Sequence, residues 1–140
     1  MNPKRSGFTL IELLLVLVIL AVLAAVVVPK FTNRSEQARQ TAAKTDIKTI
    51  ESAIETFEVE NGRYPSSEEG LGALMTAPAG LQNWHGPYIK GNGGLPKDPW
   101  GNSYIYRFPG TMNTSGFDLL SYGPDGREGG DDIGNWTTTK

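Results

Sequence analysis

Residues 7–28 read GFTLIELLLVLVILAVLAAVVV, and this stretch decides the fold. From Phe8 to Val28 only Thr9 and Glu12 are polar. A helix of these 21 residues is about 31 Å long at ~1.5 Å per residue, close to the ~30 Å hydrocarbon core of a bilayer. The stretch therefore predicts a membrane-spanning helix over residues 8–28 with one acidic side chain near its start.

The position of the small residue Gly7 distinguishes this stretch from an ordinary secretory signal. Such a signal places a small-residue cleavage site after the apolar run, but here the run leads directly into Pro29. A cut after Gly7 would instead remove the charged head, residues 1–6, and keep the helix. A carboxylate at membrane depth is costly unless it is paired, and Glu12 lies one helical turn after the amino group that this cut would create on Phe8.

The string Gly7-Phe8-Thr9-Leu10-Ile11-Glu12 resembles the prepilin signature of type IV pilins and type II secretion pseudopilins. The resemblance implies that residues 1–7 are a leader removed by a prepilin peptidase and that the Phe8 amine is methylated. It further implies that Glu12 meets the Phe8 amine of a neighbouring subunit in a filament. The alternatives are a pairing with the chain's own amine, or a glutamate at the membrane interface of a simple signal anchor.

Charge and composition exclude several classes of protein. The chain has 140 residues, a formal net charge of −2 and no cysteine, so it has no disulfides and no basic excess for nucleic acid. About 110 residues remain outside the leader and the apolar run, enough for one small domain. The chain has a single histidine, His85, and it lacks a G-x-S-x-G nucleophile-elbow sequence that could supply a serine for this histidine to activate. We therefore expect a protein that is not an enzyme.

Residues 29–60 predict a second, amphipathic part of the same helix. Pro29 is expected to kink rather than end it, because helical periodicity resumes at once. The apolar residues step by four and three positions, as on one helix face: Ala43, Ile47, Ile50, Ile54 and Phe57. The other face is mainly basic in residues 30–48 and wholly acidic in residues 49–60. This gradient is either a solvated surface or a means of pairing the basic half of one subunit with the acidic half of another.

The remaining segments predict a small α+β domain. Asn61-Gly62 should end the helix, and residues 61–102 form a connection in which Ser66 and Glu69 cap a short helix through Met75. Turn residues at 98–102 precede the expected strands. The expected fold is a long N-terminal helix packed on a small antiparallel sheet, as in type IV pilins, with strands at residues 103–108, 117–122 and 133–138.

Landmarks spread over residues 62–123 extend the resemblance to the major, G-type pseudopilins of type II secretion systems. They are Gly62-x-Tyr64-Pro65, Gly70-Leu71, Tyr88-Ile89-Lys90, Asp98-Pro99-Trp100-Gly101 and Asp118-Leu119-Leu120-Ser121-x-Gly123.

This resemblance implies a subunit that polymerises into a periplasmic pseudopilus and drives export of folded proteins across the outer membrane. Its partners would be copies of itself, minor pseudopilins, the inner-membrane assembly platform, the prepilin peptidase and membrane lipid. Residues 29–140 would lie in the periplasm, on a single-pass anchor in the bacterial inner membrane. The alternatives are a type IV pilin for adhesion or motility, and a calcium-binding, membrane-anchored ligand-binding domain that never polymerises.

The segment Ser121–Asp132, SYGPDGREGGDD, predicts either a calcium site or a solvated acidic turn. It holds four acids within eight positions, and its glycines allow tight turns that present carbonyls. Hard cations such as calcium take six to eight oxygen ligands of these kinds. The spacing does not fit an EF-hand, since alternate acids after Asp125 would fall on Arg127 and Gly129.

The resemblance favours the calcium site and implies its ligands. They would be the side chains of Asp125, Asp131 and Asp132, together with Ser121 and the carbonyls of Leu120 and Glu128. The loop is shorter than in many members of the family, which leaves open which aspartates bind.

Overall fold

The computed structural model describes residues 7–91 and 93–136, without the side chains of residues 28–33. It divides into two compact units, Met1–Ala38 and Arg39–Lys140, which we describe separately. The predicted leader lies outside the described residues except for Gly7. In chain order the elements are α1 (Leu10–Asn61), the 3-10 helix η1 (Gly70–Leu74), β1 (Ile105–Arg107), β2 (Asp118–Ser121), the 3-10 helix η2 (Gly123–Asp125) and β3 (Ile133–Gly134).

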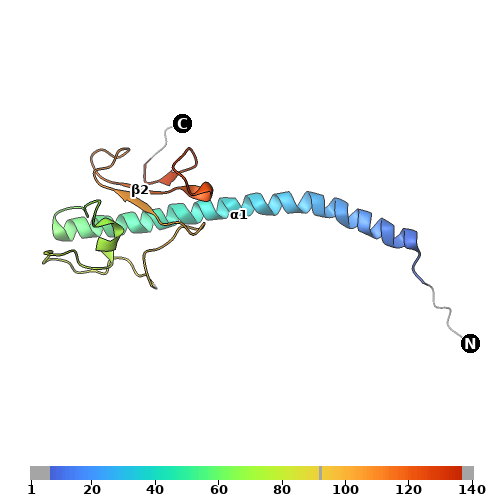
Figure 1. Ribbon diagram of the computed structural model, residues 1–140, viewed down its shortest axis with the longest axis horizontal. Coiled ribbons are helices and arrows are strands. Elements are labelled where there is room, and N and C mark those ends of the chain that lie inside the picture. The colour runs from blue at the N-terminus through green and yellow to red at the C-terminus, as the bar shows by residue number, and fades with distance from the viewer. Residues whose placement is uncertain (1–6, 92, 137–140) are drawn as a thin grey trace, which may run out of the picture. The chain divides into compact units, whose positions relative to one another are not determined.

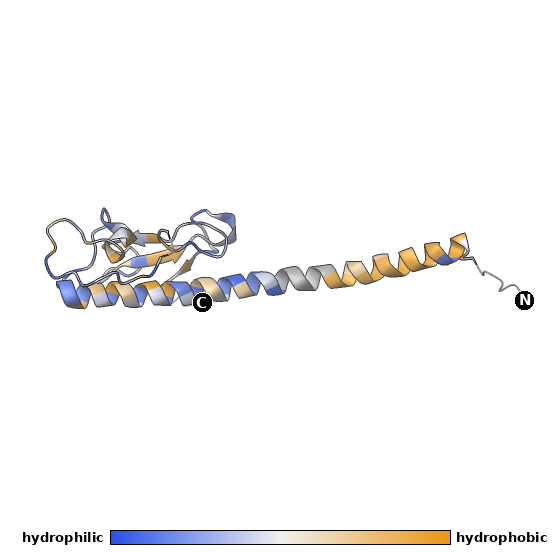
Figure 2. Ribbon diagram, turned by 90° about the horizontal axis from the view of Figure 1, so that it is seen from below, coloured by the Kyte–Doolittle hydropathy of each residue, from blue (hydrophilic) through white to orange (hydrophobic). Residues whose placement is uncertain are grey.

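The first unit contains the apolar part of α1. Its residues Leu10–Val27 are long and apolar enough to span a bilayer, and none of them is buried. In Figure 2 the ribbon of this part of the helix is coloured as hydrophobic almost throughout. The helix begins at Leu10 rather than at Phe8 because Thr9 forms its cap: the Glu12 N–H donates to Thr9 Oγ1 at 3.3 Å. It continues without interruption through position 29, as predicted.

In the second unit the predicted stripe of α1 forms one side of the core. Ala43, Ile54 and Phe57 are 0% exposed, and Ile47 and Ile50 are 2% exposed. Apolar side chains from the segment after the helix and from the sheet complete the cluster, among them Leu74 and Leu119. The views in Figures 1 and 2 agree that β2 runs beside this part of α1. Burial of the stripe is what joins helix and sheet.

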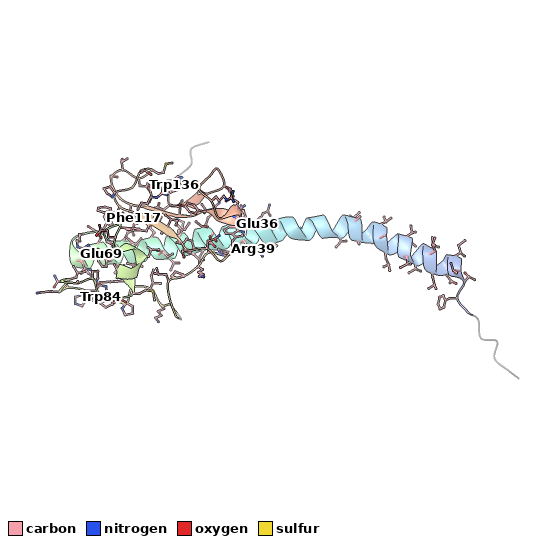
Figure 3. The ribbon with its side chains drawn as sticks, in the orientation of Figure 1. Glu36, Arg39, Glu69, Trp84, Phe117 and Trp136 are labelled. Atoms are coloured by element: carbon pink, nitrogen blue, oxygen red, sulfur yellow. The ribbon has the colours of Figure 1, made fainter. Side chains whose placement is uncertain are left out.

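The segment after α1 is organised by local hydrogen bonds. Gly62 ends the helix with a left-handed φ of 70°. The predicted capping box is confirmed, since the Glu69 N–H donates to Ser66 Oγ at 3.2 Å and the Ser66 N–H donates to Glu69 Oε2 at 2.8 Å. The helix that follows is a short 3-10 helix, η1, rather than an α-helix. Glu69 and Trp84 both lie near the C-terminal end of α1 (Figure 3).

Glu69 is also held by a guanidinium group. Arg63 donates to both of its carboxylate oxygens, at 2.7 and 2.8 Å. These bonds lower the pKa of Glu69 to about 2, against a smaller opposing effect of burial. The cap of η1 is therefore an ionised, charge-assisted one at neutral pH.

The sheet has the order β1-β2-β3 with antiparallel pairs throughout. All three strands occur where they were expected but are shorter than the predicted ranges, and residues 137 and 138 of the third range lie outside the described residues. Tyr104 precedes β1 rather than belonging to it, because its buried side chain reaches α1 and donates to Asp46 Oδ2 at 2.8 Å. The sheet is thus tied to the helix by a polar contact as well as by the core.

Candidate functional site

Two regions carry the predicted functional residues, and the first is the start of α1. Gly7, Phe8 and Thr9 precede the helix, so the peptide bond between Gly7 and Phe8 belongs to non-helical backbone. Phe8 is 78% exposed, and the Glu12 side chain is exposed on the first turn of the helix. Sequence reasoning missed the cap formed by Thr9, although Thr-x-x-Glu before an apolar run is the capping-box pattern.

The second region is the segment between β2 and β3, residues 122–132, which we call the acidic loop. Leu120 and Ser121 enter it from the buried strand β2 and are 2% and 0% exposed. Asp125 closes a short turn, since the Arg127 N–H donates to its Oδ1 at 2.9 Å. The Gly129 N–H lies 3.2 Å from both carboxylate oxygens of Asp132.

Gly123 and Asp131 bring the two arms of the acidic loop together. Gly123 has a left-handed φ of 71°, and a Cβ there would lie 2.9 Å from the carbonyl oxygen of Asp131 and 3.3 Å from its Oδ2. Only glycine leaves room for this approach. The structure therefore places an aspartate carboxylate and carbonyl from the second arm directly against the first.

Glu128 differs from the three aspartates in having a cationic partner. Arg107 donates to its two carboxylate oxygens at 3.0 and 3.3 Å. The hydrogen bond and the charge of Arg107 lower the pKa of Glu128. Its carboxylate is thus occupied, which leaves its main-chain carbonyl as the group to consider for a metal, as the sequence resemblance implied.

The charge of the acidic loop is only partly balanced within the described residues. Among the described side chains, which leave out those of residues 28–33, no Lys, Arg or His lies within 4.0 Å of Asp125, Asp131 or Asp132. Lys44 and Lys48 line the same groove as Asp131 and Asp132 but do not reach that distance. Carboxylates without a cationic partner favour a bound cation.

These residues fit a calcium ion in the kind and charge of their oxygens. The carbonyl and carboxylate of Asp131 already converge on Gly123. Among the described residues, however, no three acidic or histidine side chains are gathered closely enough to hold a metal ion. Main-chain oxygens and a closer approach of the aspartates would have to complete a coordination shell.

Sequence reasoning missed the part that Asp98 plays beside this loop. The turn at residues 98–102 was expected, and Asp98 Oδ1 accepts from the N–H groups of Trp100 and Asn102, at 3.1 and 2.8 Å. Its other oxygen accepts a 2.6 Å hydrogen bond from the Ser121 hydroxyl. An aspartate at the start of a turn is a readable signal, whereas the contact to Ser121 spans 23 positions and depends on the tertiary fold.

Two family models match the chain. The model for type II secretion system (T2SS) protein G matches residues 30–136, and the model for the prokaryotic N-terminal methylation motif matches residues 2–28. The chain belongs to the type II secretion system protein G family.

Relatives of known name agree with this membership. The type II secretion system core protein G of Pseudomonas aeruginosa is 49% identical, with 95% of this chain and 96% of the relative aligned. The Vibrio cholerae protein of the same name is 45% identical over 95% and 92% of the two chains. The Escherichia coli K12 protein is 43% identical over 99% and 96%.

A solved structure has the same fold. The major pseudopilin from the type 2 secretion system of enterohaemorrhagic Escherichia coli superposes with a TM-score of 0.64 at 34% identity, covering 79% of this chain and 96% of that one. As a member of this family the chain is a pseudopilin, a subunit of the pseudopilus of a type II secretion system. The sequence-based expectations of family, α+β fold and function are confirmed.

Proposed function

We propose that this pseudopilin is made as a precursor, is cut after Gly7 by a prepilin peptidase, and then polymerises from the bacterial inner membrane into the periplasm. The observation that carries the proposal is the prepilin-type junction at Gly7-Phe8 directly before a fully exposed apolar helix. Polymer growth would push folded proteins through an outer-membrane channel. The role is mechanical, and we assign the chain no catalytic residue.

The geometry of the junction supports cleavage at this bond. A peptidase must bind its substrate backbone in extended form, and residues 7–9 precede the helix. The Thr9 cap keeps the helix start after the cut. The new ammonium on Phe8 would then lie about one helical turn from Glu12, so that an apolar layer would contain a cation and an anion that can pair.

The test of this proposal is the N-terminus and assembly state of the mature protein. Mass spectrometry of membranes from peptidase-positive cells should show a chain that begins with methylated Phe8. Glu12→Ala should abolish filaments while the protein remains in the membrane, and Glu68→Ala, an exposed acid of the second unit, should leave filaments intact. Filaments built equally well by Glu12→Ala would overturn the role of Glu12.

The outer face of α1 supplies a second, electrostatic contact between subunits in this proposal. Lys44, Lys48 and Glu55 are all exposed on the second unit. The acidic part of this face, residues 49–60, carries four glutamates. Two of them already have partners within the chain, since Glu51 accepts a hydrogen bond from Asn135 and Glu60 accepts one from Tyr88. Glu55 and Glu58 are therefore the better candidates to meet the lysines of another copy.

Charge reversal separates this contact from a merely solvated face. Lys48→Glu should reduce the yield of filaments, and a second reversal, Glu55→Lys or Glu58→Lys, should restore it. A surface charge without a partner tolerates reversal with little effect. A Lys48→Glu variant that assembles normally, or that neither reversal rescues, would show that the face is only solvated.

We further propose that the acidic loop binds one structural calcium ion through Asp125, Asp131 and Asp132, with main-chain oxygens such as those of Leu120 and Glu128 completing the shell. The support is the group of aspartates without cationic partners among the described residues and the close approach of Asp131 to Gly123. The ion would join the two arms of the loop and neutralise their charge.

Thermal unfolding of the full chain in detergent tests this ion. At a calcium concentration of ~100 times the dissociation constant, binding adds ~2.7 kcal/mol of stability, and a chelator should remove it. Asp131→Asn should abolish most of the calcium-dependent shift, and Glu68→Gln should not. An identical melting temperature with calcium and with chelator would refute the calcium site while leaving polymerisation untouched.

The remaining alternative is an anchored domain that binds a ligand and never polymerises. Overproduction separates the two: a polymerising pseudopilin gives fibres that depend on Glu12 and persist without the outer-membrane channel. A protein that stays monomeric in the membrane under the same conditions would favour the anchored domain.

A further inference from the structure

We propose that Asp98 is a positioning residue of the acidic loop, acting through Ser121, and that the Ser121 hydroxyl is therefore a link and not a calcium ligand. This inference rests on the calcium part of the proposed function. It changes the ligand set that the sequence resemblance implied, in which Ser121 was included.

Asp98 is a buried carboxylate whose hydrogen bonds point in two directions. It is 4% exposed. Its Oδ1 accepts the N–H groups of Trp100 and Asn102 and so closes the turn before β1. Its Oδ2 accepts the Ser121 hydroxyl at 2.6 Å, a short, charge-assisted bond at the end of β2. One buried side chain thus joins the turn to the strand that enters the acidic loop.

Ser121 passes this anchoring on to the loop backbone. Its hydroxyl hydrogen is used by Asp98, and its oxygen accepts the Gly123 N–H at 3.1 Å. The side chain is 0% exposed. A hydroxyl with its hydrogen committed, one lone pair in use and no exposed surface is poorly placed to bind an ion in solution. Gly123, which it holds, is the residue against which Asp131 packs.

A second contact connects the same turn to the acidic loop. The side-chain amide of Asn102 packs on Gly126, where a Cβ would lie 3.4 Å from Nδ2 and 3.5 Å from Oδ1. Gly126 directly follows Asp125, one of the proposed ligands. The turn at residues 98–102 therefore supports both ends of the first arm of the loop. Such support orders the ligands before the ion arrives, which strengthens metal binding.

The test is a calcium titration of the full chain in detergent by isothermal calorimetry. Outer residues that orient metal ligands contribute ~10–100-fold to affinity, so Asp98→Asn should weaken calcium binding at least about tenfold. Asparagine keeps the size of the side chain but replaces one acceptor oxygen with a donor, so it cannot satisfy both the turn and Ser121.

Asp118 offers a matched control within the same chain. It is 1% exposed, and its carboxylate also accepts backbone N–H groups of a turn, those of Thr111, Met112 and Asn113. None of its hydrogen bonds in the described residues goes to the acidic loop. Asp118→Asn should therefore lower the melting temperature as Asp98→Asn does, but should change calcium affinity by less than about twofold.

Ser121→Ala decides between a link and a ligand. If Ser121 acts only by relaying the contact from Asp98, Ser121→Ala should lose no more affinity than Asp98→Asn, and the double variant should lose no more than Asp98→Asn alone. If the hydroxyl bound calcium directly, Ser121→Ala would lose much more than Asp98→Asn, and the two losses would multiply. That result would overturn the inference and leave the calcium proposal standing.

Hydrogen exchange tests the positioning role without any metal. In the presence of a chelator, Asp98→Asn should accelerate exchange of the amides of residues 121–126 at least about tenfold relative to Asp118→Asn. Equal exchange in the two variants would overturn the inference even if calcium binds. Failure of the unmodified chain to bind calcium would instead refute the calcium proposal. The proposed effect of Asp98 on calcium affinity would then fall with it.

Discussion

The two parts of helix α1 differ both in how their apolar residues are distributed and in what surrounds them. In Leu10–Val27 apolar residues occupy every side of the helix, and the side chains remain exposed, with Leu10 at 82% and Leu15 at 60%. In the second part apolar residues recur every third or fourth position, and Ile54 and Phe57 are 0% exposed. A stripe can be covered by one small sheet, whereas an all-round apolar surface requires lipid or other helices. Figure 2 shows this contrast along the helix.

The largest expected effect comes from truncating one large apolar side chain in each part. Phe57→Ala should lower the free energy of unfolding of the second unit by ~3–5 kcal/mol, because it opens a cavity in a close-packed core. Leu15→Ala should leave that free energy unchanged within ~0.5 kcal/mol, since its side chain is 60% exposed and lies outside the core of the second unit. Urea unfolding of the full chain in detergent, followed by tryptophan fluorescence, measures both. Equal losses of unfolding free energy in the two variants would contradict the difference in packing between the two parts of α1.

An introduced aspartate should affect the first part of α1 more than the second, because it acts on membrane insertion. Val18→Asp should disfavour membrane insertion by ~2.5–3.5 kcal/mol, the cost of an aspartate at the centre of a span. Ala42→Asp, at an exposed position of the second part, should leave insertion unchanged. The fraction of protein that resists alkaline extraction from membranes measures insertion. Full retention of Val18→Asp would argue against a membrane-spanning role.

Tyr104→Phe tests the polar contact between the sheet and the second part of α1. Burial, then the hydrogen bond to Asp46, raises the pKa of Tyr104, so its hydroxyl remains a donor at all ordinary pH values. Losing this bond to a charged acceptor should destabilise the second unit by ~1–2 kcal/mol. Urea unfolding measures the loss, and Tyr122→Phe provides a control, because the Tyr122 hydroxyl accepts a hydrogen bond from the partly exposed Arg107.

The smallest expected effect is that of the Glu69 cap, and it depends on pH. Because the folded pKa of Glu69 lies at about 2, below its ordinary value of 4.5, its contribution is fully present above pH ~4.5 and disappears as the pH falls toward ~2. Glu69→Gln should destabilise the second unit by ~0.5–1 kcal/mol at pH 7, since Arg63 is partly exposed. The difference from the unmodified chain should shrink at pH 3, and a constant difference would contradict the assignment.

Local patterns in the chain were sufficient for most of the secondary structure and for the family. The stripe from Ala43 to Phe57, the capping box at Ser66 and Glu69 and the three strands all lie where predicted. These features depend on residues a few positions apart, whose spacing follows directly from helix and strand geometry. The ends of the strands and the 3-10 type of η1 were predicted less accurately, because core packing and the hydrogen bonds of the turns determine them.

Contacts between distant positions came only from the tertiary structure. The Ser121 hydroxyl meets Asp98 across 23 positions, Arg107 meets Glu128 across 21, and Asn135 reaches Glu51 across 84. Each depends on which side chains the packed core brings together, and no periodicity of one segment encodes that choice. The acidic composition of the loop is therefore readable from the chain, whereas the residues that hold its shape became visible only once helix, turn and sheet were assembled.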